Sequence, residues 1–228
     1  MALAYPVNLN ISGWNCLVVG GGSVGLRRGE SLLNCDANVT VVAPIVDGKL
    51  DELGKSGRIV LLKEPFIPSH LDGMRIVIAA TNSTEVNDAI GELCRNSAIL
   101  VNRADDASKG DFAVPAVVRR GALTLSVATD GSHPRLTTQI AKALEASYGP
   151  EYEPYVAMLR MLRLEILAEA AAHHEREAAF AALNEREEDL LHLIRSGNEA
   201  EALHTARQTV SSAIHSLRAH HGKGNHHQ

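Results

Sequence analysis

Three glycines near the start of the chain are spaced as in a dinucleotide-binding turn. Gly20, Gly22 and Gly25 satisfy G-x-G-x-x-G, between an apolar run at 16–19 and a helical stretch at 24–33. The first glycine permits a tight turn, the second lets a pyrophosphate approach the backbone, and the third lets helix and strand pack closely. Because the free amide groups and the dipole at a helix start attract anions, this turn predicts a bound dinucleotide.

The residues that normally select between the two nicotinamide cofactors are missing. In such folds an acidic residue about 20 positions further on, at the end of the second strand, binds the adenosine ribose. Here the second predicted strand, 39–42, is followed by Ala43, Pro44 and Ile45, and the nearest carboxylate is Asp47. No arginine stands at that point to favour a 2′-phosphate. The residues alone therefore leave the choice between NAD and NADP open.

The first half of the chain alternates short β-branched runs with amphipathic segments, which predicts a parallel sheet with helices on both faces. The predicted strands are 16–19, 39–42, 59–62, 76–80 and 99–101, and the predicted helices are 24–33, 49–55 and 82–96. Asn82, with Glu85 three residues on, is the expected N-cap of the last helix. Because ligands bind at the carboxyl ends of such strands, Thr81 and Asn82 should lie beside the cofactor.

The pattern changes after residue 112. Alternating apolar residues at 123–127, after the apolar run 113–118, predict an antiparallel hairpin. Pro134 should begin a helix that ends near Gly149. The remainder is rich in Ala, Leu, Glu and Arg, and predicts two or three packed helices with a break at 196–198.

We therefore expect an α/β fold in three parts. A Rossmann-type parallel-sheet domain (1–112) is followed by a small hairpin-and-helix dimerisation segment (113–149) and a helical C-terminal domain (150–228).

Composition excludes several functional classes. The chain has 45% apolar and 21% charged residues, and a net charge of −5 without a long basic run argues against nucleic acid as a partner. The longest apolar runs fall far short of the roughly 20 residues of a membrane helix, and the first ten residues do not resemble a secretory signal. Three cysteines without a C-x-x-C pair predict reduced thiols in a cytoplasmic protein, with neither a disulfide framework nor a metal site.

Several motifs, taken in order, resemble one family. They are Tyr5-Pro6-Val7-Asn8-Leu9, the glycine fingerprint 16–28, Ala79-Ala80-Thr81-Asn82, Asn102-Arg103-Ala104-Asp105, Asp111-Phe112-Ala113-Val114-Pro115 and Gly131-Ser132-His133-Pro134. Over about residues 3–150 the chain resembles the siroheme-biosynthesis dehydrogenases. These are precorrin-2 dehydrogenases, some of which are also sirohydrochlorin ferrochelatases, and the same module forms the N-terminal part of multifunctional siroheme synthases.

The resemblance implies NAD-dependent oxidation of precorrin-2 to sirohydrochlorin, and it leaves open whether Fe²⁺ is then inserted to give siroheme. It also implies a homodimer built largely by the hairpin segment. The family's nucleotide contacts would fall on Ser23, Val24, Pro44 and Ile45. The family commonly has alanine at the position of Gly25, a change that we expect this fold to tolerate.

The family's catalytically important aspartate matches Asp105, which follows the fifth predicted strand at the edge where the nicotinamide should lie. Like-charge repulsion from Asp106 is expected to raise the pKa of Asp105, so that it accepts the proton lost in the oxidation. A serine of the family's tetrapyrrole pocket aligns with Thr129, which keeps a hydroxyl. His133 is a candidate proton relay. Alternatively, Asp105 is a loop carboxylate that caps a helix, and His133 is a solvent-exposed loop histidine.

A tetrapyrrole with several carboxylates needs cations in its cleft despite the negative net charge. The candidates are Arg103, Lys109, Arg119, Arg120 and Arg135, each of which could instead be an ordinary surface charge. Two other functions compete with the tetrapyrrole dehydrogenase. A non-catalytic dinucleotide-sensing module would need the glycine turn but not the motifs at 102–105 and 131–134. A dehydrogenase of a small metabolite would not need the hairpin, the helical part or the arginines.

Overall fold

The computed structural model describes residues 4–129, 131–170 and 172–223, and the chain divides into two compact units. Unit 1 comprises Met1–Pro115 and Ala128–Pro134, and unit 2 comprises Ala116–Val127 and Arg135–Gln228. Each unit has its own hydrophobic core. The predicted hairpin segment, 113–149, is therefore shared between the two units.

Unit 1 is built on a five-stranded parallel sheet with the strand order β3-β2-β1-β4-β5. The strands are β1 (Asn15–Val19), β2 (Asn38–Val42), β3 (Val60–Leu62), β4 (Ile76–Ala79) and β5 (Leu100–Arg103). The central strands are buried on both faces, because helices cover each side of the sheet. The expected Rossmann-type sheet is confirmed.

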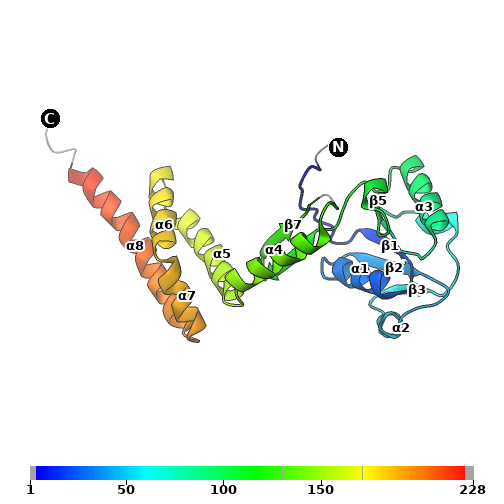
Figure 1. Ribbon diagram of the computed structural model, residues 1–228. Helices are drawn as coiled ribbons and strands as arrows, with labels where there is room; N and C mark the ends of the chain where they lie inside the picture. Colours follow the sequence, from blue (N-terminus) through cyan, green and yellow to red (C-terminus); the bar gives the residue numbers. More distant parts are fainter. Residues whose placement is uncertain (1–3, 130, 171, 224–228) are drawn as a thin grey trace. The chain divides into compact units, whose positions relative to one another are not determined.

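The helices of unit 1 lie on opposite faces of this sheet (Figure 1). They are α1 (Ser23–Leu33), α2 (Gly48–Lys55) and α3 (Thr84–Asn96), with the short 3₁₀ helices η1 (Pro68–Leu71) and η2 (Ala107–Lys109). Helices α1 and α2 pack on the face that carries Ile76 and Ile78, and α3 packs on the face that carries Val77 and Val101.

The expected N-cap of α3 is wrong by one residue. The hydroxyl oxygen of Ser83, not the Asn82 side chain, accepts a hydrogen bond from the amide of Val86 at 3.2 Å. The hydroxyl of Thr81 donates to the carbonyl oxygen of Ser83 at 3.0 Å. The Thr81 side chain, just after β4, therefore holds Ser83 as the N-cap of α3, one residue later than the sequence pattern suggests.

Unit 2 holds the hairpin and the helical part. Strands β6 (Ala116–Arg120) and β7 (Leu123–Val127) pair antiparallel, and they are followed by α4 (Pro134–Ser147), α5 (Tyr152–Glu169), α6 (His173–Glu185), α7 (Glu187–Arg195) and α8 (Glu199–Lys223). After α4 the described residues form four helices rather than the expected two or three. Their shared core includes Leu162, Leu183, Leu190 and Ala206.

None of the helices in the described residues is long and apolar enough to span a membrane.

The glycine turn between β1 and α1 depends on close backbone contacts. Gly20 has φ +130°, which is strained for any residue with a side chain, and a Cβ there would overlap the carbonyl oxygen of Ala80. A Cβ on Gly25 would overlap the carbonyl oxygen of Gly20. The turn as it stands therefore has no room for an alanine at position 25, because α1 approaches its own entry loop too closely.

We expect Gly25→Ala to lower the free energy of unfolding by about 1–3 kcal/mol, the usual cost of adding a methyl group to a tightly packed site. Thermal unfolding followed by circular dichroism measures the change. Gly22→Ala is the matched control, because a Cβ on Gly22 meets no atom within 4 Å and φ is −84° there. Equal unfolding temperatures for Gly25→Ala and the unaltered chain would contradict the packing argument.

Candidate functional site

The glycine turn lies between the loops that follow β2 and β4. The amide of Gly20 donates to the carbonyl oxygen of Val42 at 3.0 Å, and the amide of Asp47 donates to that of Gly21 at 2.7 Å. On the other side, the backbone of Ala80 lies against Gly20. The carboxyl ends of β1, β2 and β4 thus bring the nucleotide residues expected from the sequence to one edge of the sheet.

The start of α1 leaves its backbone amides without side-chain partners. The Asp47 side chain caps α2 and Ser83 caps α3, whereas Gly22 gives α1 no side-chain cap. The first turn of α1 also lacks an acidic residue, while α2 and α3 carry Asp51 and Glu85 there. Because unpaired amides and the helix dipole favour an anion, this is the helix start of unit 1 best suited to a pyrophosphate.

The exposed residues around the turn fit the rest of a dinucleotide. Ser23 and Val24 are exposed at the start of α1, and Pro44 is exposed after β2. Ile45 has 85% of its surface accessible, in a loop whose backbone lies against Gly21. An exposed isoleucine beside an anion site is suited to contact an adenine ring. The residues present therefore fit a dinucleotide.

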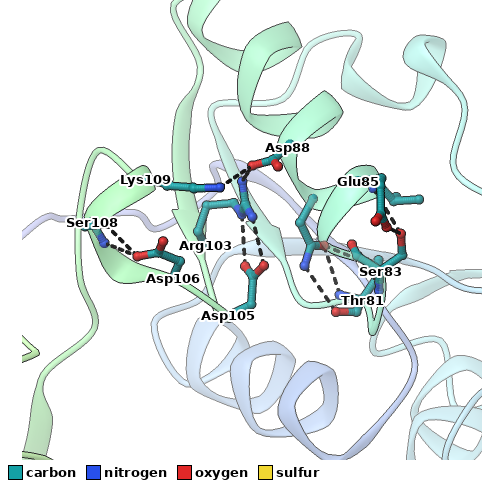
Figure 2. Close-up of polar contacts among 11 residues, drawn as sticks. Thr81, Ser83, Glu85, Asp88, Arg103, Asp105, Asp106, Ser108 and Lys109 are labelled. Carbon is teal, nitrogen blue, oxygen red and sulfur yellow. Dashed lines mark hydrogen bonds and ion pairs between the residues drawn. The ribbon is translucent and has the colours of Figure 1, made fainter.

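Arg103, at the end of β5, holds Asp105 through a two-point ion pair (Figure 2). Its Nε donates to Oδ1 of Asp105 at 2.9 Å, and its second terminal nitrogen donates to Oδ2 at 2.8 Å. The first terminal nitrogen donates to Asp88 of α3 at 2.6 Å. The Arg103 side chain is 1% exposed and the Asp105 side chain 27% exposed. A buried guanidinium thus fixes the orientation of a carboxylate that still faces solvent.

The expected rise in the pKa of Asp105 is wrong. The Arg103 guanidinium holds the pKa of Asp105 far below its ordinary value, and the amide of Asn87 lowers it further. Asp106 does not oppose this effect. It accepts hydrogen bonds from the amide of Ser108 at 3.0 Å and from its hydroxyl at 2.6 Å, and these lower the pKa of Asp106 too. Asp105 is therefore a permanent negative charge rather than a base tuned to neutral pH.

Asn87 is a residue of this site that the sequence analysis missed. It is fully buried on α3, accepts hydrogen bonds from the hydroxyl and amide of Thr81 at 2.8 and 3.2 Å, and donates to the Thr81 carbonyl oxygen at 3.1 Å. It thereby links the loop after β4 to Asp105. A polar residue in the buried stripe that continues through Ile90 and Cys94 was the available signal.

The cations expected to bind a substrate are not alike. Arg103 is buried and paired with Asp88 and Asp105, so its guanidinium is not available to contact a substrate. Lys109 pairs with Asp88 at 3.0 Å but remains half exposed. In unit 2, Arg120 donates to the carbonyl oxygen of Tyr148 at 2.9 Å and has a structural role there.

The other expected substrate residues lie on exposed segments. Arg119 and Arg135 are exposed residues of unit 2. Thr129 and His133 belong to unit 1, where the amide of His133 donates to the Thr129 hydroxyl at 3.4 Å and the Ser132 hydroxyl donates to the Thr129 carbonyl oxygen at 2.5 Å. The substrate roles of these four residues stay predictions.

Among the residues that the structure describes, no group of three or more His, Cys, Asp or Glu side chains could hold a metal ion. None of the three cysteines, all of which lie in the described residues, forms a disulfide. Burial raises the pKa of the Cys16 and Cys94 thiols to about 11, so neither thiol is a ready nucleophile.

Comparison with known proteins agrees with this site. A family model for NAD(P)-binding domains matches residues 7–116. The siroheme synthase of Chromobacterium violaceum is 39% identical over 149 residues, 64% of this chain and 32% of that protein. The precorrin-2 dehydrogenase of Priestia megaterium is 34% identical over 160 residues, 70% of this chain and 79% of that protein. This chain therefore spans about a third of the length of the first relative and most of the second.

A solved structure gives the same result. The protein described as "SirC, precorrin-2 dehydrogenase" superposes with a TM-score of 0.69 at 28% identity, covering 92% of this chain and 98% of that one. The resemblance inferred from the motifs is confirmed, and so is the order of a parallel sheet, a hairpin and C-terminal helices. The chain belongs to the precorrin-2 dehydrogenase family.

Proposed function

We propose that this chain is an NAD-dependent dehydrogenase that oxidises precorrin-2 to sirohydrochlorin. The proposal depends mainly on the arrangement of residues at one edge of the unit 1 sheet. There an uncapped glycine turn suited to a dinucleotide shares the edge with a carboxylate that Arg103 keeps ionised and oriented. The precorrin-2 dehydrogenase of Priestia megaterium supports the choice of substrate.

The glycine turn would bind the cofactor. Bound NAD⁺ supplies the hydride acceptor. The amides at Ser23 and Val24 would hold its pyrophosphate, with Thr81 and Asn82 on the opposite side of the turn. Asp47 supports NAD over NADP, because a carboxylate at the start of α2 repels a further phosphate.

Asp105 would act by its charge. Removal of a hydride from a reduced tetrapyrrole leaves positive charge on the macrocycle until a pyrrole proton is lost. An ionised carboxylate, fixed in place before the reaction, stabilises that charge and accepts a hydrogen bond from a pyrrole N–H. With its low pKa, Asp105 would pass the proton on to solvent rather than keep it.

We also propose a homodimer in the cytoplasm. Helix α4 buries none of its residues in the described structure, and Val117, Leu136 and Ile140 are 38–43% exposed. A two-stranded sheet with one uncovered helix is marginally stable alone, so a second copy covering this surface would stabilise it. Three cysteines without a disulfide, two of them buried, are typical of a reducing compartment.

The direct test is an absorbance assay with purified protein, precorrin-2 and NAD⁺. We expect sirohydrochlorin to form, and Asp105→Asn to lower kcat by about 100-fold, the usual loss when a fixed charge is removed from the reacting atoms. The control is Asp106→Asn, since the hydrogen bonds that the Asp106 side chain accepts in the described part of the chain come from Ser108 in η2.

Undiminished turnover by Asp105→Asn would refute the assigned role. A chain that binds NAD⁺ but shows no turnover with NAD⁺ or NADP⁺ would instead be a dinucleotide sensor.

The pH dependence separates a fixed charge from a base. A carboxylate whose pKa is lowered in the folded protein stays ionised until the pH falls through that low value. We therefore expect kcat/KM to show no acid limb due to Asp105 from about pH 5 to pH 8. Arg103→Met removes the main cause of the lowered pKa, so an acid limb due to Asp105 should begin at a higher pH in this variant than in the unaltered enzyme. An acid limb in the unaltered enzyme that disappears in Asp105→Asn would show that Asp105 is a general base.

Iron insertion is a second activity that the ionised state of Asp105 favours. Carboxylate oxygen is an acceptable ligand for a divalent ion, and at this site it is available without losing a proton. We expect Fe²⁺ to enter sirohydrochlorin faster with protein than without it, and Asp105→Asn to abolish the difference. Absorbance of siroheme measures both rates under anaerobic conditions, and equal rates with and without the unaltered protein would exclude the activity.

A further inference from the structure

A small apolar pocket in unit 1 is lined by residues other than those assigned to the proposed reaction. It has a volume of about 130 Å³ and lies on the face of the sheet that α1 covers. Its walls are mainly aliphatic and aromatic, from Leu9, Leu32, Ile78 and Phe112. Its size is close to that of a cavity that accepts a benzene molecule.

One charged side chain lines this pocket without a protein partner. Arg28 of α1 is partly buried, and its Nε is completely buried yet bonds to no atom of the described residues. None of the ion pairs among these residues involves Arg28. Burial and the neighbouring Arg27 both lower the pKa of Arg28, so the protein itself disfavours the charge there. A partly buried guanidinium whose Nε has neither water nor a partner among the described residues is unfavourable, and a bound anion would offset the cost.

A second polar residue lines the pocket, and a third lies on the strand beside it. Ser31, one helical turn after Arg28, also lines the pocket. Asn102 pairs with Ile78 in the sheet register and donates its amide to the carbonyl oxygen of Phe112 at 2.8 Å. Its Oδ1 is the second buried side-chain atom without a partner in the described residues. A few polar groups converging on an apolar pocket are typical of a small-molecule site.

We propose that the Arg28 pocket binds a carboxylate carried on a short apolar arm. A guanidinium matches a carboxylate with two parallel hydrogen bonds, and one negative charge balances the one positive charge present. The apolar walls then cover the arm that carries the carboxylate. The volume limits the occupant to a group about as large as butyrate.

Two sources can supply such a group. One is a carboxylate arm of the tetrapyrrole, which rests on the proposed function. Arg28 is five residues along α1 from Ser23, or about 8 Å from the helix start that would bind the cofactor, within reach of a macrocycle. The other source is a small free acid that acts as an effector.

Sodium butyrate is the probe for the site, and butyramide is its uncharged match. Methyl NMR of the full chain should show butyrate-dependent shifts at Leu32, Ile76 and Ile78, and none with butyramide. We expect Arg28→Met to weaken butyrate binding by about tenfold or more, the loss expected for a charge-assisted pair. Arg28→Lys should restore part of it. Arg27→Met, on the adjacent residue outside the pocket, should bind butyrate as the unaltered chain does.

Steady-state kinetics then identify the source. If the tetrapyrrole supplies the carboxylate, butyrate competes with precorrin-2 and Arg28→Met raises KM by about tenfold while kcat holds. If a free acid is the ligand, butyrate binds without competing. A protein that binds butyrate but does not oxidise precorrin-2 would refute the proposed function and keep the site. Absence of butyrate shifts at the pocket methyl groups, or identical shifts in Arg28→Met, would overturn the site whatever the activity.

Discussion

Close backbone contact at the glycine turn determines where the candidate site lies. Gly20 meets the carbonyl of Ala80, and Gly25 meets the carbonyl of Gly20, at separations that leave no room for a side chain. These contacts bring the loops after β2 and β4 against the start of α1. The same absence of side chains leaves the first amides of α1 uncovered, so one steric constraint creates both the packing and the anion site.

The buried charge of Arg103 is the second organising feature. A guanidinium with almost no exposed surface must be paired, and here it takes Asp88 from α3 and Asp105 from the loop after β5. The two partners tie the helix to the strand end that carries Asp105. The pairing also decides the chemistry of Asp105, because a carboxylate held by two hydrogen bonds from a guanidinium keeps its charge and releases any proton it receives.

Two arginines of unit 1 show how one residue type serves two purposes. The carboxylates of Asp88 and Asp105 accept the hydrogen bonds of Arg103, which thereby fixes the position of Asp105. Arg28 faces aliphatic walls and satisfies none of its hydrogen bonds within the described residues. The fold therefore accounts for the first arginine, and the proposed ligand would pair with the second.

The sequence by itself determined the sheet, the glycine turn and the family. Their signals are local, since β-branched runs, glycine spacing and short motifs need no distant partner to be recognised. It did not determine the ionisation of Asp105, the role of Asn87 or the cost of a methyl group at Gly25. These three properties depend on side chains and carbonyl groups that are distant in sequence, or whose direction is set by the local backbone conformation. Only the tertiary structure places Arg103 between Asp88 and Asp105, and that contact lowers the pKa of Asp105, where repulsion from Asp106 was expected to raise it.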